Sequence, residues 1–87
     1  MSDHLAWAKG GTARFMSVAD DAVTLRSTTP APPGSRLDAT LLAEPTLAIK
    51  IKVHGSKLEP DGTFTLRAKV LEANRALRDR IASLLAS

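Results

Sequence analysis

The sequence contains no cysteine and no tyrosine, and only one tryptophan and two phenylalanines, among its 87 residues. The absence of cysteine excludes disulfide bonds, thiolate metal ligands and cysteine nucleophiles. Surfaces that stack nucleic-acid bases rely on several exposed aromatic side chains, and three aromatics give little basis for one. We therefore expect aliphatic side chains to fill the interior.

Long apolar runs are absent as well. The amino terminus has an early acid and no apolar stretch of signal-sequence length, and no later stretch approaches the length of a membrane span. We expect a cytoplasmic protein. A chain of 87 residues forms one domain and hardly more, so we expect a single domain over residues 1–87.

The charge is only moderately basic. Twelve lysines and arginines face nine acids, which gives a formal net charge of +3, and no block of five or more like charges occurs. This pattern is typical of a solvated surface more than of an arm that follows phosphates. Nucleic-acid binding stays possible on charge but is weakly supported.

The strongest pattern is a β-hairpin over residues 47–70. Two apolar sets alternate with polar residues, and the period of two predicts one buried face and one exposed face. Glu59-Pro60-Asp61-Gly62 predicts the turn between the two arms, because proline suits its second position and glycine its fourth. The expected inward residues are Leu47, Ile49, Ile51, Val53, Phe64, Leu66, Ala68 and Val70.

Shorter strands are predicted over residues 5–8, 12–18, 22–27 and 36–43. The pattern of residues 12–18 does not decide which side faces inward. A turn is expected at Asp20-Asp21, the three prolines in residues 28–34 predict a loop, and Glu44-Pro45 is expected to end the fourth strand.

From Asn74 onward the apolar period becomes helical, and we expect the stripe Leu77, Ile81, Leu84 and Leu85 to pack either onto the sheet or across one mouth of a barrel. Asn74 is the expected N-cap. On these patterns alone the chain is a small, basic, β-rich domain with one helix.

Candidates for catalysis or metal binding are few. His4 lies near a terminus that we expect to fray, and His54 is expected to face solvent from the edge of a strand. Asp20 and Asp21 are adjacent, but their neighbours supply no further oxygen ligands for a cation. We expect no catalytic residue, no metal site, no cofactor and no enzymatic activity.

The outer face of the hairpin is the most distinctive surface. Lys50, Lys52 and His54 are expected to stand across from Thr65, Arg67 and Lys69, so that like charges face one another. Such a face either keeps an exposed sheet soluble or binds an anionic partner, and we favour solubility on the pattern alone. Arg75, Arg78 and Arg80 would enlarge it if the helix lies on the same side.

The order of these elements resembles a PilZ domain, a small bacterial six-stranded antiparallel β-barrel with a C-terminal helix whose best-known members bind cyclic di-GMP. The resemblance covers residues 13–86 and rests on the run from Phe15 to Ser27, Pro33-Gly34, the hairpin, and a helix that begins at Asn74-Arg75. It implies a barrel over about residues 5–72 and a helix over about residues 74–86.

The nucleotide motifs of that family are missing. The family signature is RxxxR followed by D/NxSxxG; at the second motif Ser17 replaces the acid, Ala19 the serine and Ala22 the glycine, and the first eleven residues contain no arginine. Paired arginines grip phosphate and guanine in a way that other residues do not reproduce. We therefore expect no tight binding of cyclic di-GMP by this chain alone.

A degenerate member of this kind implies an adaptor that acts through protein contact in motility, pilus, polarity or surface-polysaccharide control. Alternatives are a basic module for nucleotides, DNA or RNA, a homo-oligomer, and a cyclic di-GMP site completed by another chain. The candidates for partner contact are Lys50, Lys52, Arg67, Lys69, Arg75 and Arg78.

Overall fold

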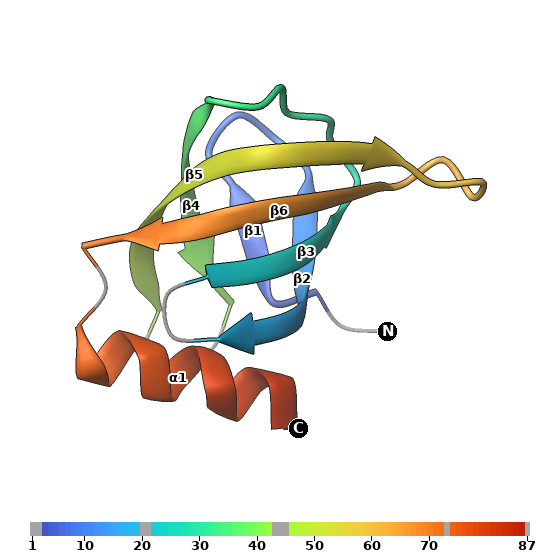
Figure 1. Ribbon diagram of the computed structural model, residues 1–87. Helices are drawn as coiled ribbons and strands as arrows, with labels where there is room; N and C mark the ends of the chain where they lie inside the picture. Colours follow the sequence, from blue (N-terminus) through green and yellow to red (C-terminus); the bar gives the residue numbers. More distant parts are fainter. Residues whose placement is uncertain (1–2, 20–21, 43–45, 73, 87) are drawn as a thin grey trace.

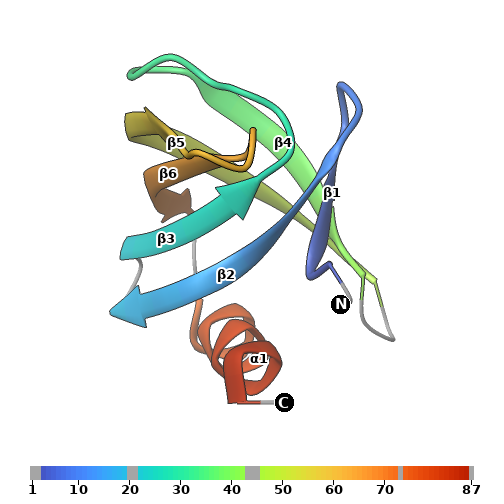
Figure 2. The same cartoon turned by 90° about the vertical axis from the view of Figure 1, so that its right-hand side faces the viewer.

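The computed structural model describes residues 3–19, 22–42, 46–72 and 74–86. Six antiparallel strands close into a barrel in the order β1-β2-β3-β6-β5-β4, and one helix follows them (Figures 1 and 2). The predicted fold class is confirmed. The elements are β1 (Leu5–Trp7), β2 (Thr12–Ala19), β3 (Ala22–Ser27), β4 (Arg36–Leu41), β5 (Leu47–Leu58), β6 (Phe64–Leu71) and α1 (Arg75–Ala86).

The β5–β6 hairpin has close to its predicted bounds, and β5 continues to Leu58, directly before the predicted turn. Its turn forms as expected: the Gly62 N–H donates to the Glu59 carbonyl over 3.0 Å, and Gly62 adopts a φ of 87°. Figure 1 shows this hairpin extending beyond the ends of the neighbouring strands. We call residues 55–65 the arm.

The barrel interior is mainly aliphatic, as expected. Its fully buried side chains are dominated by Leu, Ile and Val, with Trp7 and Phe15 at the edges of the same cluster. The expected inward residues of the hairpin are buried except Leu47 and Phe64, which are half-buried. Alternation thus located the core correctly where strands are regular.

The structure shows which residues of strand β2 face inward, which its sequence pattern did not decide. Ala13 and Phe15 point inward, but the register with β3 shifts between Phe15 and Ser17, and Val18 then packs against the core. A bulge inserts one residue and reverses the alternation beyond it. Both sides of the sequence pattern therefore contribute to the interior.

Helix α1 lies across one end of the barrel (Figure 1), which decides between the two expected packings. Ile81 is only 1% exposed and belongs to the core, Leu77 and Leu84 pack at its edge, and Leu85 remains 37% exposed, contrary to the predicted stripe. The Asn74 side-chain oxygen accepts the Leu77 N–H over 2.8 Å, so the predicted N-cap is confirmed.

Several boundaries differ from the sequence predictions. Strand β1 ends at Trp7 and β4 at Leu41. The turn expected at Asp20-Asp21 and the stop expected at Glu44-Pro45 lie outside the described residues. Helix α1, within the described part of the chain, is too short and too polar to cross a membrane.

Candidate functional site: a basic face on the barrel wall

The outward side chains of β4, β5 and β6 form one wall of the barrel. Arg36 stands directly opposite Lys52, and Lys52 stands directly opposite Lys69. Three adjacent strands therefore present three cations in one line, which we call the cationic row. Opposed side chains in a sheet have their Cβ atoms about 5 Å apart, so these charges repel one another.

The sequence set Lys50, Lys52 and His54 as a group across from Thr65, Arg67 and Lys69, without assigning individual pairs. In the structure Lys52 faces Lys69, whereas Lys50 faces Leu71 and Arg67 faces Gly55. The reason is a register shift between Val53 and Gly55, which leaves His54 as the extra residue of a bulge. Strands β5 and β6 thus place fewer cations directly opposite one another than predicted.

Glycine at position 55 makes room for Arg67. A Cβ atom built on Gly55 would lie 3.2 Å from the Arg67 Nη2 atom, closer than side chains ordinarily approach. Arg67 therefore packs flat over the strand, next to His54, rather than standing beside Lys52 as part of the row.

Arg36 is a member of the row that the sequence prediction missed. It lies on β4 and joins the face only because β4 pairs with β5 in register. The alternation of residues 36–41 places Arg36, Asp38 and Thr40 on one face of the strand, and this is the sequence signal that could have found Arg36. The alternation does not show that β4 pairs with β5.

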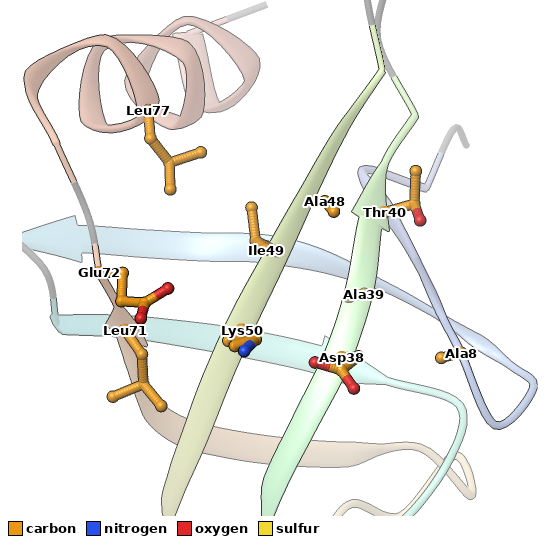
Figure 3. Close-up of a pocket in the computed structure, with 10 residues that line it drawn as sticks. All are labelled: Ala8, Asp38, Ala39, Thr40, Ala48, Ile49, Lys50, Leu71, Glu72 and Leu77. Carbon is orange, nitrogen blue, oxygen red and sulfur yellow. The ribbon is translucent and has the colours of Figure 1, made fainter.

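The row continues into two hollows beside it. The next pair along β4 and β5 is Asp38 opposite Lys50. Both residues line a hollow of ≈ 260 Å³ that reaches Leu77 of helix α1 (Figure 3) and a shallower one of ≈ 470 Å³ that also touches Arg36. The apolar side chains around the first include Ala48, Ile49, Leu71 and Leu77.

Arg75 and Arg78, the other predicted contact residues, lie on helix α1 and not on the barrel wall. Arg75 is 4.0 Å from the Asp79 carboxylate, an exposed pair one helical turn apart. The helix covers the end of the barrel and has its strand contacts with β2. Leu77 of the same helix lines the first hollow, and the contact role of Arg75 and Arg78 stays a prediction.

The three positions that depart from the PilZ motif lie together. Ser17, Ala19 and Ala22 all line an open depression of ≈ 480 Å³ bordered by β2, β3, β5 and β6, which we call the motif hollow. Arg67 and His54 line its other side. The structure thus groups the degenerate positions with one of the predicted contact residues.

Three charged groups at the base and turn of the arm have local partners. Arg26 lies 3.9 Å from Glu59 and 3.8 Å from Asp61, which ties β3 to the turn of the arm. The Thr63 hydroxyl and then the Thr63 N–H donate to Asp61, and these bonds lower the pKa of that carboxyl. These contacts hold the arm and do not form a reactive site.

His4 is not at a fraying end, contrary to expectation. Its Nδ1 atom accepts the Phe15 N–H over 2.9 Å, and its ring stacks on the Phe15 ring. Burial, and then the charge of Arg14, lower the pKa of His4, while Asp3 opposes this shift. Its role in this geometry is structural.

Among the residues that the structure describes, no three His, Asp or Glu side chains gather closely enough to hold a metal ion. Family models, curated proteins and solved structures provide no match to this chain. The cationic row and the motif hollow are the two places where the structure groups several of the predicted site residues.

Proposed function

We propose that this chain is a degenerate PilZ-type adaptor, a non-enzymatic cytoplasmic domain of a bacterial regulatory circuit that acts by binding another protein. Motility, pilus, polarity and surface-polysaccharide control are the circuits that the resemblance implies. The proposal starts from a closed six-stranded barrel with a helix across one end, the architecture that the sequence resemblance implies.

The motif hollow carries the proposal. Ser17, Ala19 and Ala22 line it where the family motif would supply an acid, a serine and a glycine. Two alanine side chains offer no hydrogen bonds to a guanine or a phosphate, and the first eleven residues supply no arginine. Loss of charge-assisted contacts of this kind removes several kcal/mol of binding energy. We therefore expect that the chain keeps the barrel but does not bind cyclic di-GMP tightly.

Two measurements on the full chain test this function. Calorimetry with cyclic di-GMP is expected to give no saturable heat. Affinity capture from a native bacterial lysate, with an unrelated basic protein of similar size as the control bait, is expected to recover a specific protein. Saturable nucleotide heat contradicts the loss of ligand binding, and capture no better than the control contradicts the adaptor role.

A nucleotide or nucleic-acid module is the second candidate, because Arg67 and His54 border the motif hollow and would meet an anion bound there. Labelled DNA, RNA and cyclic di-GMP, titrated at two salt concentrations, test it. Binding through phosphates must weaken steeply as salt rises, whereas the adaptor predicts no saturable binding at either concentration.

A further inference from the structure

Two residues of the cationic row, Arg36 and Lys52, carry charges that the described fold leaves uncompensated. Arg36 and Lys52 lie in direct register, and neither forms an ion pair with a carboxylate of the described residues. Like charges directly opposite one another in a sheet destabilise it. An anionic group bound across the row would relieve this repulsion.

The hollow beside the row adds an apolar anchor point. Its volume of ≈ 260 Å³ exceeds the roughly 150 Å³ of a cavity that accommodates a benzene ring. Figure 3 shows Leu77 pointing from helix α1 toward Ile49 of β5, with Lys50 next on β5 and Asp38 beside it on β4. An aliphatic side chain from a partner fits this place by size and polarity.

Row and hollow form one continuous face. The shallower hollow of ≈ 470 Å³ touches Arg36 at the row and Leu71 at the apolar side, with Asp38, Lys50 and Glu72 between them. Protein interfaces combine a small apolar centre with a polar rim. The arrangement on β4, β5 and β6 has both parts within a few residues of each other.

The chemistry favours a protein segment over a nucleic acid. Asp38 and Glu72 line the same face and would repel a continuous phosphate backbone, whereas a segment with separate carboxylates can avoid them. Trp7 and Phe15 are buried, which removes two of the three aromatic side chains that could stack on bases.

We infer that this face binds an acidic segment of a partner protein, whose carboxylates contact Arg36, Lys52 and Lys69 and whose single apolar side chain enters the hollow at Leu71 and Leu77. The inference rests on the proposed adaptor function and names its partner chemistry. It adds Arg36 to the predicted contacts and leaves out the helix arginines.

Fluorescence anisotropy with labelled peptides tests the inference on the full chain. The probe is a peptide of about twelve residues in which glutamates are separated by serines around one central leucine, a length that spans several strands in extended form. Matched probes replace the leucine by serine, or every glutamate by lysine, and an oligothymidylate carries a similar negative charge. We expect the acidic leucine peptide to bind best.

Two variants locate the binding. Lys52→Glu reverses the centre of the row and is expected to weaken binding of the acidic leucine peptide by about tenfold or more. Lys57→Glu makes the same change on the same strand, but in the arm opposite Thr65, and is expected to change binding less than about twofold at physiological salt. Lys52→Glu removes a like-charge contact, so it should fold at least as well as the parent, which circular dichroism checks.

A third variant tests the hollow. Ala48 is exposed and lines it, and Ala48→Trp should fill it. We expect this change to remove the advantage of the leucine peptide over the serine peptide, while the serine peptide itself binds as before.

Three results overturn the inference: no binding of the acidic leucine peptide, equal losses in Lys52→Glu and Lys57→Glu, or oligothymidylate binding as tightly as the peptide. Affinity capture distinguishes a failure of this inference from a failure of the proposed adaptor role. If Lys52→Glu captures the same protein as the parent chain, the adaptor stands and this face is wrong; if neither captures one, the adaptor role itself fails.

Discussion

The indole Nε1 of Trp7 donates a hydrogen bond to the hydroxyl oxygen of Ser27 over 2.9 Å, within the barrel core. Ser27 is completely buried, and the same oxygen also accepts the Thr29 N–H at 3.0 Å and donates to the Thr29 carbonyl at 2.8 Å. One hydroxyl thus joins β1, the end of β3 and the start of the proline-rich loop.

Ser27→Ala is expected to destabilise the protein by roughly 1–3 kcal/mol, because a buried indole N–H and a backbone N–H then lose their acceptor. Urea unfolding, followed by the fluorescence of the one tryptophan in the sequence, measures this loss. Ser17→Ala removes an exposed hydroxyl and should change stability by less than about 0.5 kcal/mol.

A double-mutant cycle with Trp7→Phe isolates the bond itself, with unfolding followed by circular dichroism. We expect the double variant to lose about 1 kcal/mol less stability than the sum of the losses of the two single variants. Once the indole N–H of Trp7 is gone, removal of its acceptor on Ser27 no longer leaves that donor unsatisfied. Additive effects would show that the hydrogen bond contributes nothing beyond packing.

Gly11→Ala is expected to be far more destabilising than Gly10→Ala. Both glycines have positive φ values, 94° and 111°, which add roughly 1–2 kcal/mol of strain for alanine. A Cβ at Gly11 would also collide with the Thr29 hydroxyl, whereas a Cβ at Gly10 meets nothing within 4 Å. Overpacking of this kind adds roughly 1–3 kcal/mol. Thermal unfolding of the two variants, compared at equal pH, measures the difference; equal loss of stability would contradict it.

Local features of the fold were predictable from the sequence because their determinants are adjacent in the chain. The turn at Glu59–Gly62 and the N-cap at Asn74 each depend on one side chain or one φ angle. The alternation of β5 and β6 likewise identified most of the core. Closure into a barrel followed only from the family resemblance.

Register was not predictable. The register shifts after Phe15, in the pairing of β2 with β3, and after Val53, in the pairing of β5 with β6, where Arg67 lies against Gly55; the alternation within a single strand does not show either bulge. A shift by one residue moves every later side chain to another partner. For this reason the sequence set the cations of the two hairpin strands across from one another but did not give their individual pairs, and it missed Arg36.

The His4 contact with Phe15 predicts a stability that falls in mild acid. The bond from the Phe15 N–H requires an unprotonated Nδ1, and the pKa of His4 is lowered from its ordinary value of 6.5 by burial and by Arg14. The unfolded chain therefore binds the proton more readily than the folded chain does. This contribution is complete above pH 6.5, begins to be lost as the pH falls below that value, and is fully lost once the pH lies below the folded pKa.

His4→Asn should remove this dependence, because an amide oxygen can accept the Phe15 N–H without titrating in this range. We expect urea midpoints between about pH 8 and about pH 5 to fall less for His4→Asn than for the parent, although the variant loses the ring stacking and is less stable at the upper end. His54→Asn, an exchange of the same type at an exposed position of β5, should keep the parental pH profile. If the parent and His4→Asn lose stability in parallel as the pH falls, the hydrogen bond to Phe15 does not couple folding to the protonation of His4.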